Sequence, residues 1–314
     1  MTLLVAITAW EVAPWLERFR HLLPERRVVA LGETFARDEV RYAASWKHPP
    51  GSLADLPRLE VLFSLGAGVD HLMGDPLLPD VPLVRVVDAD LTNRMSEYVV
   101  MHCLMHLRQQ RRYDRQQRDK VWLDDREQPG AADVRVGILG LGVLGQDAAK
   151  KLGIMGFDVA GWSRSPKAIE GIATWSGADG LGPFLARTDI LVCLLPLTSD
   201  TRAILNRPLL RRLARDGRLG GPVLINAGRG GLQVEDDILA CLDEGTLGAA
   251  TLDVFETEPL PSESPLWTHP AVTVTPHNSA MSGPIAVAVQ IVDQIRRFEA
   301  GEALRNVVDP RMGY

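Results

Sequence analysis

The feature that most constrains the fold is a stretch in which an apolar strand, a glycine-rich turn and a helix follow one another without a break. Residues 134–139 (VRVGIL) have the pattern of a buried strand, GLGVLG follows at 140–145, and residues 146–152 have the pattern of a helix. A GxGxxG sequence in this setting is typical of a dinucleotide-binding turn. A glycine turn with a purely structural role is the alternative.

Each glycine of this turn has an expected role. Gly140 permits the tight turn, Gly142 lets the backbone approach a pyrophosphate, and Gly145 allows the helix to pack closely on the strand. The amides at the N-terminus of the helix would then face the phosphate charge.

Strand-like runs alternate with helical segments along most of the chain, which favours parallel sheets covered by helices. The first part of the chain has such runs at residues 3–8, 27–31, 61–65 and 82–87. The second part has six, at residues 134–139, 157–162, 189–195, 222–227, 249–254 and 272–275. Six runs of this kind describe one complete doubly wound sheet. With 314 residues in all, the chain is expected to form two α/β domains.

Two further helices are expected outside this alternation. Residues 96–122 predict one long helix with a strongly charged second half. Asp114 and Asp119 interleave with its basic residues, so a solvated or subunit-facing helix is favoured over an arm that binds nucleic acid. Near the C-terminal end, Ser282 and Pro284 predict the N-cap and the first residue of a helix. This helix follows the second sheet, and we expect it to pack on the first domain.

The composition excludes several classes of protein. Apolar residues make up 46% of the chain and charged residues 24%, which rules out a disordered or collagen-like chain. The net charge of −6 argues against nucleic acid or an anionic membrane as the main partner. Three scattered cysteines and no visible targeting segment favour a reducing, cytoplasmic location. Prolines interrupt the uncharged residues 264–292, so no membrane span is expected.

No metal site is predicted. His102 and His106 stand four residues apart on the long helix, as in a zinc pair, but position 103 is Cys where the zinc motif HExxH has Glu. We expect these histidines to lie at a helix interface instead.

The residues after the second strand of the second domain indicate which nicotinamide cofactor is used. A site for NAD would place Asp or Glu about 20 residues after the glycine turn, to bind the ribose 2′-hydroxyl. Residues 162–167 read WSRSPK instead. The guanidinium of Arg164 and the hydroxyl of Ser163 can bind a 2′-phosphate, which a carboxylate would repel. The sequence therefore favours NADPH, with NAD as the other possibility and a solvated Arg164 as the structural alternative.

Three segments with charged or polar residues end successive predicted strands, where open α/β sheets bind ligands. They are NAGRGG at 226–231, LDVFETEPL at 252–260 and VTPHN at 274–278. Arg229 could bind the carboxylate of an α-keto acid and polarise its keto oxygen, and His277 could give that oxygen a proton. Glu258 could hold the imidazolium of His277. Each residue alone could be an ordinary loop residue, but three at one sheet edge favour a catalytic site.

These motifs resemble those of the D-isomer-specific 2-hydroxyacid dehydrogenases, over essentially the whole chain and in the family's order. The resemblance rests on GLGVLG, LPLTSDTR (195–202), NAGRG, LDVFETEPLP and TPHNS. The short chain, WSRS after the second strand and SLGAGVDHL near the front are most similar to the glyoxylate/hydroxypyruvate reductase A branch of that family.

The resemblance implies a fold and a domain layout. A Rossmann cofactor domain at residues 97–282 would be inserted in a flavodoxin-like substrate domain formed by residues 1–96 and 283–314. Both would be doubly wound parallel-sheet domains. The long helix after Ser96 would be a dimer arm, so a homodimer is expected.

The resemblance also implies roles for individual residues. Arg229 would orient the substrate, His277 would be the proton donor and Glu258 its partner. Asp253 would contact the nicotinamide carboxamide, the amides of residues 66–68 would bind the substrate carboxylate, and Trp46 would wall the pocket. The complete set of expected cofactor contacts is Gly140, Gly142, Val143, Leu144, Gly145, Ser163, Arg164, Pro196, Ala227, Gly228 and Asp253, and the expected substrate contacts are Trp46, Gly66, Ala67 and Gly68.

The function expected from these features is NADPH-dependent reduction of a small 2-keto acid, glyoxylate to glycolate or hydroxypyruvate to D-glycerate. Two alternatives remain at the level of sequence. One is an NAD-linked D-2-hydroxyacid dehydrogenase for a larger substrate, and the other is a non-catalytic protein that senses a dinucleotide.

Overall fold

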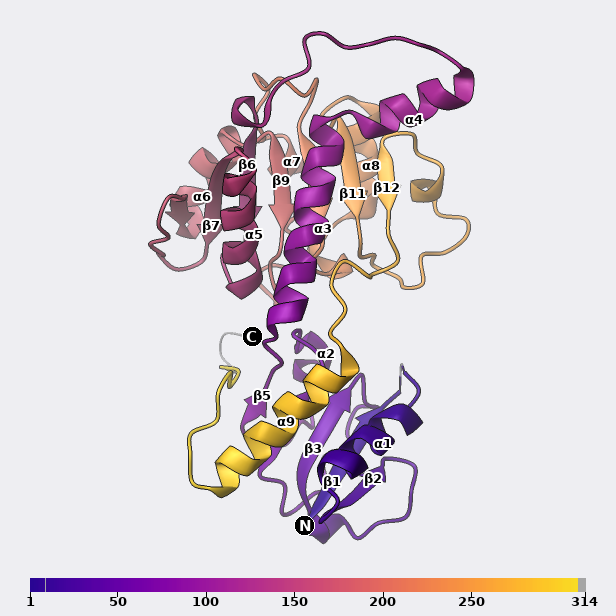
Figure 1. Ribbon diagram of the computed structural model, residues 1–314, viewed down its shortest axis with the longest axis vertical. Coiled ribbons are helices and arrows are strands. Elements are labelled where there is room, and N and C mark those ends of the chain that lie inside the picture. The colour runs from indigo at the N-terminus through magenta and orange to yellow at the C-terminus, as the bar shows by residue number, and fades with distance from the viewer. Residues whose placement is uncertain (9, 310–314) are drawn as a thin grey trace. The chain divides into compact units, whose positions relative to one another are not determined.

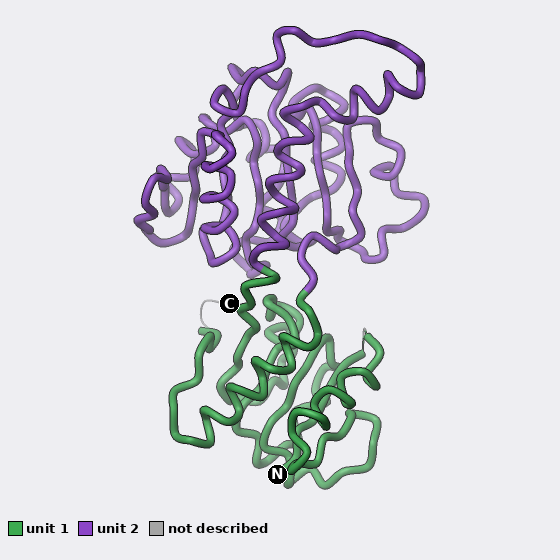
Figure 2. The backbone as a smooth tube through the Cα atoms, in the orientation of Figure 1, with its two compact units in different colours: residues 1–91, 282–314 green, residues 92–281 purple. Residues whose placement is uncertain are grey.

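A computed structural model describes residues 1–8 and 10–309 and divides the chain into two compact units (Figure 2). Unit 1 comprises Met1–Leu91 and Ser282–Tyr314, and unit 2 comprises Thr92–Met281. The divisions lie close to the expected boundaries at 96 and 283, and residues 310–314 of the expected substrate domain lie outside the described residues. Which unit binds substrate and which binds cofactor stays a prediction.

Within the described part of unit 1, five parallel strands form one sheet in the order β2-β1-β3-β4-β5. This is the flavodoxin-like strand order. The strands are β1 (Thr2–Ile7), β2 (Arg27–Ala30), β3 (Val40–Trp46), β4 (Val61–Ser64) and β5 (Leu83–Val84).

The sequence analysis predicted no strand at the position of the central strand β3, and this prediction was wrong. Its middle residues, Ala43, Ala44 and Ser45, have little strand preference of their own. The strand forms because it pairs with β1 on one side and β4 on the other. Pairing and burial on both faces therefore override local propensity at this position.

Helices cover one face of this sheet, and loop residues with a short helix cover the other. The helices of unit 1 are α1 (Ala13–Leu22), α2 (Asp70–Met73) and α9 (Pro284–Glu299), with the 3-10 turn η1 (Arg37–Glu39). Figure 1 shows α1 and α9 in front of β1 and β3, and both helices share an apolar cluster with these strands. The N-cap of α9 is Gly283, so the expectation of a Ser282 cap was wrong, while Pro284 is the first helical residue as predicted.

Within the described part of unit 2, a seven-stranded parallel sheet has the order β12-β11-β10-β9-β6-β7-β8. Counted from β6, this is the 3-2-1-4-5-6 order of the Rossmann fold with one strand added. The two sheets confirm the predicted α/β class with two doubly wound domains. The strands are β6 (Arg135–Leu139), β7 (Asp158–Ser163), β8 (Ala173–Ser176), β9 (Ile190–Cys193), β10 (Val223–Asn226), β11 (Ala249–Leu252) and β12 (Val272–Val274).

The expected count of six strands was wrong, because β8 adds a seventh at the edge of the sheet. Its sequence, ATWS, lacks an apolar run, and it pairs only with β7 among the described strands. An edge strand that is only half-buried leaves little periodicity to detect.

Helices cover both faces of the sheet in unit 2. In Figure 1, α3 and α5 lie in front of it and α7 and α8 behind it, and each group shares its own apolar cluster with the strands. The helices are α3 (Ala89–Leu107), α4 (Gln110–Asp119), α5 (Val143–Ile154), α6 (Gly177–Ala186), α7 (Arg207–Leu210) and α8 (Glu235–Asp243), with the 3-10 turns η2 (Ala131–Asp133), η3 (Gly230–Leu232) and η4 (Pro265–Trp267).

The long helix expected at 96–122 is two helices, so this prediction was wrong in detail. The first begins earlier, at Ala89, and the chain breaks at Gln109, whose φ of 54° lies in the left-handed region. A left-handed residue cannot continue a right-handed helix. The charged second half therefore forms the separate helix α4.

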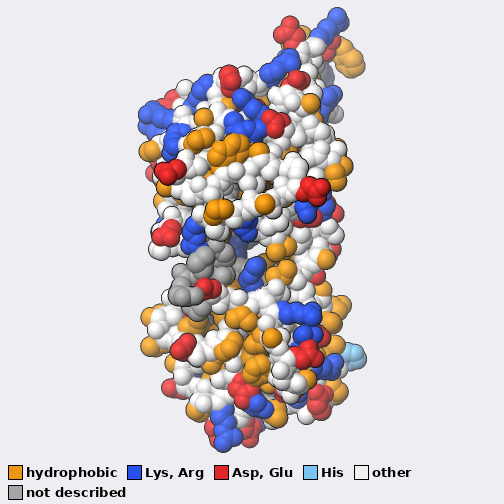
Figure 3. All heavy atoms as spheres, turned by 90° about the vertical axis from the view of Figure 1, so that its left-hand side faces the viewer, with side chains coloured by type: hydrophobic (Ala, Val, Ile, Leu, Met, Phe, Trp, Pro, Cys, Tyr) orange, Lys and Arg blue, Asp and Glu red, His pale blue; other side chains and the backbone are white. Residues whose placement is uncertain are grey.

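Two surface properties bear on partners. Among the described residues, no helix has both the length and the apolar character that a bilayer span requires. Figure 3 shows acidic and basic side chains interspersed over the visible face of each unit.

Candidate active site

The residues expected to bind cofactor or to act in catalysis in unit 2 all follow carboxyl ends of its strands. Because the strands are parallel, these ends meet at one edge of the sheet. The residues at this edge are Gly140 after β6, Ser163 at the end of β7, Pro196 after β9, Arg229 after β10, Asp253 after β11 and His277 after β12.

The glycine turn after β6 has the geometry expected of a phosphate-binding turn. Gly140 has a φ of 113°, which favours glycine, and a Cβ on Gly145 would lie 1.9 Å from the carbonyl oxygen of Gly140. Gly142 is the N-cap of α5, and a Cβ placed there would meet no heavy atom within 4 Å. Val143 and Leu144 follow in the first turn of α5, where backbone N–H groups have no partner within the helix. The turn is therefore closely packed at Gly140 and Gly145, and it has open space next to Gly142.

The end of β7 presents a cation. Ser163 is buried and its hydroxyl donates to the carbonyl of Ser165 at 2.9 Å, so its side chain shapes the turn. Arg164 is exposed over 40% of its side chain, and its guanidinium lies 4.0 Å from the carboxylate of Asp200. An ion pair at this distance and exposure is weak.

The other expected cofactor contacts lie on the neighbouring loops. The carbonyl of Pro196 accepts a hydrogen bond from the Thr201 hydroxyl at 2.7 Å. The N–H of Ala227 donates to the carbonyl of Cys193, and the N–H of Gly228 donates to Asn226 Oδ1. These bonds fix the two loops to the ends of β9 and β10.

The loop that carries Arg229 is pressed against the segment that leads to Glu258. A Cβ on Gly230 would lie 1.7 Å from the carbonyl oxygen of Phe255, so only glycine fits there. The buried side chain of Gln233 links the same two segments, because it accepts from Asn226 Nδ2 at 2.8 Å and donates to the carbonyl of Val254 at 2.9 Å. The sequence predictions did not include Gln233.

His277 and Glu258 are in direct contact. The distance from His277 Nδ1 to Glu258 Oε2 is 2.8 Å, and the other carboxylate oxygen of Glu258 accepts the N–H of Phe255 at 3.1 Å. The side chains are 42% and 27% exposed. The pair is thus oriented by the backbone and open to solvent, as a proton donor requires.

The turn that carries His277 is held by Asp253, which is completely buried. One oxygen of its carboxylate accepts from Thr275 Oγ1 at 2.6 Å and from the N–H of Asn278, and the other accepts the N–H of Ser279. His277 itself has a φ of 51°, in the left-handed region. The contact with the nicotinamide that was expected of Asp253 stays a prediction.

The sequence predictions also missed Tyr98 and Thr275, which support this turn. The Tyr98 hydroxyl is 2.8 Å from Thr275 Oγ1, and burial raises the pKa of Tyr98 well above its usual range. Tyr98 lies on α3, far from Thr275 in sequence, and no local motif marks such a pair.

Trp46 and the glycine loop expected to bind substrate lie together in unit 1. Trp46 ends β3, and a Cβ on Gly66 would lie 2.4 Å from its indole ring. The indole is stacked on Trp10 at a ring distance of 4.6 Å, and the ring of His71 contacts it in a tilted arrangement at 4.3 Å. The N–H of Gly66 donates to Ser64 Oγ at 3.2 Å.

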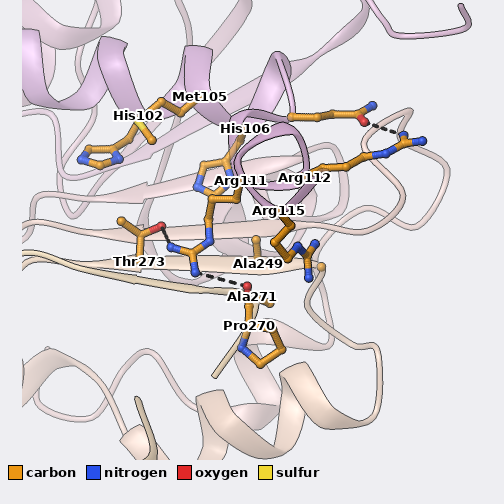
Figure 4. Close-up of a pocket in the computed structure, with 12 residues that line it drawn as sticks. His102, Met105, His106, Arg111, Arg112, Arg115, Ala249, Pro270, Ala271 and Thr273 are labelled. Carbon is orange, nitrogen blue, oxygen red and sulfur yellow. Dashed lines mark hydrogen bonds between the residues drawn. The ribbon is translucent and has the colours of Figure 1, made fainter. Parts of the chain in front are cut away.

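A separate pocket of about 180 Å³ lies between α3, α4 and the strands β11 and β12 of unit 2 (Figure 4). Arg111 points across it and donates to Thr273 Oγ1 and to the carbonyl of Pro270. His106 also lines it, with Nε2 2.9 Å from Thr251 Oγ1, and burial lowers the pKa of His106 to about 4. Both His102 and His106 therefore lie against the sheet, and no cluster of metal-ligand residues occurs among the residues that the structure describes.

Comparisons with known proteins identify the family of the chain. The sequence profile described as "D-isomer specific 2-hydroxyacid dehydrogenase, NAD binding domain" matches residues 100–279. The chain is 41% identical, over 96% of each chain, to a protein of Serratia proteamaculans named glyoxylate/hydroxypyruvate reductase A.

Solved structures give the same result. An NADPH-dependent glyoxylate/hydroxypyruvate reductase from Sinorhizobium meliloti, in complex with NADP and sulfate, has a TM-score of 0.93 and 52% identity, with 100% of this chain and 99% of that chain covered. A probable 2-hydroxyacid dehydrogenase from Rhizobium etli, in complex with NADP, HEPES and L(+)-tartaric acid, has a TM-score of 0.95 and 47% identity, with the same coverage. The chain therefore belongs to the D-isomer-specific 2-hydroxyacid dehydrogenase family.

Proposed function

We propose that this protein is an NADPH-dependent reductase of small 2-keto acids, which converts glyoxylate to glycolate or hydroxypyruvate to D-glycerate. The observation that carries the proposal is the exposed His277–Glu258 pair, at the sheet edge that also carries Arg229 and the glycine turn. The names of the relatives from Serratia and Sinorhizobium support the same activity.

The side chains divide the chemistry between them. The guanidinium of Arg229 binds the substrate carboxylate and polarises the keto oxygen. His277 donates the proton through Nε2, because Nδ1 is held by Glu258. The carboxylate of Glu258 stabilises the imidazolium before the proton leaves. NADPH, when bound, supplies the hydride.

The residues of unit 2 fit a dinucleotide with a 2′-phosphate. The open position at Gly142 and the first-turn amides of α5 suit a pyrophosphate, and the exposed Arg164 suits the additional phosphate. We expect Arg164→Ala to raise the KM for NADPH about ten- to hundredfold and to leave the KM for NADH nearly unchanged, as loss of a charge-assisted bond of ~1.5–3 kcal/mol implies.

Arg126→Ala is the matched control for this substitution, because Arg126 is an exposed arginine paired with Asp124 outside the candidate cofactor site. Equal efficiency of the unaltered enzyme with NADPH and NADH would contradict the cofactor preference.

In unit 1, we propose that Trp46 and the loop of residues 66–68 contact the substrate. The N–H of Gly66 already donates to Ser64, so the amides of Ala67 and Gly68 are the better donors for a carboxylate. Both residues are half-buried at the end of β4.

We also propose a cytoplasmic homodimer that forms through α3, α4 and the segment after them. Val121, Trp122 and Leu123 are 50%, 100% and 56% exposed, and apolar surface of this kind marks interaction sites. Light scattering after size exclusion is expected to give twice the mass of the chain, and a monomer at micromolar concentration would remove this part of the proposal.

The direct test of the activity is a steady-state panel. Purified protein is mixed with NADPH or NADH and with glyoxylate, hydroxypyruvate or a larger 2-keto acid, and the reduced nicotinamide band is followed. We expect fastest turnover with NADPH and the two small acids. Preference for a larger acid with NADH, or binding of NADPH without turnover of any acid, would replace the proposal.

A further inference from the structure

Unit 1 contains a buried chain of three polar side chains that none of the expected roles uses. Ser45 Oγ is 2.9 Å from His48 Nδ1, and His48 Nε2 is 2.9 Å from Asp75 Oδ2. Ser45 is completely buried, and the side chains of His48 and Asp75 are 0% and 2% exposed. The set has the composition of a nucleophilic triad, but no substrate can reach a hydroxyl buried in this way.

The buried carboxylate of Asp75 has a donor at each oxygen. Besides His48, Asp75 Oδ2 accepts the N–H of Gly51 at 2.9 Å, and Oδ1 accepts the N–H of Leu77 at 2.9 Å. Burial alone would raise the pKa of Asp75, but these two N–H groups and His48 together outweigh it and hold the pKa below its usual value. The carboxylate is therefore kept charged, and charge-assisted bonds are the strong kind.

These bonds connect two loops of unit 1. His48 and Gly51 lie in the turn that follows β3, and Asp75 and Leu77 lie just after α2. The turn begins at Lys47, whose φ of 50° lies in the left-handed region and needs support from its surroundings.

Trp46, which is expected to line the substrate pocket, lies between the same two loops. Trp46 directly precedes the turn, and the ring of His71 in α2 contacts its indole at a centroid distance of 4.3 Å. The indole ring of Trp46 also lies against Gly66, which begins the loop of residues 66–68. A change in the distance between the two loops would therefore move Trp46 relative to the amides of Ala67 and Gly68.

We propose that His48 and Asp75 are a positioning pair, which sets the geometry of Trp46 against the substrate-binding loop at residues 66–68. The inference rests on the proposed function, since it takes these residues to contact the 2-keto acid. Neither His48 nor Asp75 touches the substrate, and the pair acts through the two loops that it joins.

The first test uses Asp75→Asn, which keeps the shape of the side chain and removes its charge, and His48→Phe, which removes both ring nitrogens and with them the contacts to Ser45 and Asp75. We expect the KM for glyoxylate or hydroxypyruvate to rise about tenfold, because small misplacements of binding groups are costly. The kcat and the KM for NADPH should stay within about twofold. His48→Gln, whose amide can still donate to Asp75, should retain most of the affinity.

Glu60→Gln is the matched control, because it weakens the Arg41–Glu60 ion pair elsewhere in unit 1. It should lower stability without changing the KM for the keto acid. If folded Asp75→Asn and His48→Phe enzymes bind the keto acid as the unaltered enzyme does, the pair is only structural and the inference is overturned.

Hydrogen exchange supplies a readout that does not depend on activity. Peptides that cover residues 46–53 and 66–78 should exchange faster in Asp75→Asn and at the normal rate in Glu60→Gln, since the N–H groups of Gly51 and Leu77 lose their charged acceptor. Faster exchange in a protein that reduces no keto acid would refute the proposed function but leave the link between the loops intact. Unchanged exchange would overturn the link itself.

Discussion

Each unit contains a histidine paired with a carboxylate at nearly the same distance, yet the two pairs suit opposite purposes. The His277–Glu258 distance is 2.8 Å and the His48–Asp75 distance is 2.9 Å. The side chain of His277 is 42% exposed and that of His48 is 0% exposed. Access, and not the geometry of the pair, separates a proton donor from a structural link.

The second ring nitrogen shows the same contrast. His48 uses both nitrogens within the protein, one toward Ser45 and one toward Asp75. Among the described residues, no protein group is hydrogen-bonded to Nε2 of His277, so this nitrogen can face a substrate. A proton can therefore be exchanged at His277 during turnover, whereas His48 keeps the same partners throughout.

The largest effect that separates the two pairs is expected at His277. His277→Ala should lower kcat for keto-acid reduction by about 10²–10⁴-fold, since that is the usual contribution of a general acid. Binding of NADPH, measured by fluorescence titration, should hardly change. A His277→Ala enzyme with most of its kcat would mean that another group delivers the proton.

Arg229→Ala should also have a large effect, but on both KM and kcat. Its guanidinium is expected to bind the substrate in both the ground state and the transition state, so KM should rise while kcat falls. A steady-state comparison with His277→Ala separates the two roles, because His277→Ala should change kcat alone. The assignment of Arg229 fails if its variant keeps the normal KM for glyoxylate and hydroxypyruvate.

The carboxylates should differ in their effect on turnover. Glu258→Gln should lower kcat for keto-acid reduction, because the carboxylate that contacts Nδ1 of His277 is replaced by a neutral amide. Asp75→Asn should leave kcat within about twofold, since His48 takes no part in proton transfer. An unchanged kcat in Glu258→Gln would contradict the role of Glu258.

The buried pair should in turn dominate stability. His48→Phe leaves the buried carboxylate of Asp75 without its side-chain donor, and the free energy of unfolding should fall by about 1–3 kcal/mol. His277→Ala removes an exposed pair and should change stability by less than 1 kcal/mol. Urea unfolding of both variants measures the difference, and equal losses would show that exposure does not separate the pairs.

The smallest effect is expected in acid. The pKa of Asp75 in the folded protein lies below its ordinary value of 3.8, so protonation of this carboxylate is linked to unfolding. Its contribution to stability is complete above the ordinary value and is lost as the pH falls through the folded value. The free energy of unfolding should therefore decline less steeply below about pH 4 in Asp75→Asn than in the unaltered protein.

Local sequence was sufficient for the parts of the site that a single strand end supplies. The glycine turn needs three glycines at fixed spacing after a strand, and Arg229, Glu258 and His277 each lie in a loop that follows a strand whose apolar run is visible. Parallel pairing then brings these ends to one edge.

The parts that could not be predicted depend on contacts between distant segments. Strand β3 exists because of its neighbours, and the break at Gln109 has no proline or glycine to mark it. His48 and Asp75 lie 27 residues apart, in turns whose loop geometry decides whether they meet. Periodicity and spacing carry no information about such pairs.

The left-handed backbone at His277 determines when the free-energy cost of positioning the proton donor is met. A residue that is not glycine is held in the left-handed region there, at a cost of roughly 1–2 kcal/mol, and the buried carboxylate of Asp253 fixes the two amides that follow it. That cost is incurred once, when the chain folds, and not again with each substrate molecule. Because Glu258 also contacts the ring, the imidazole is oriented before the keto acid arrives, so the binding energy of so small a substrate need not be used to orient the proton donor.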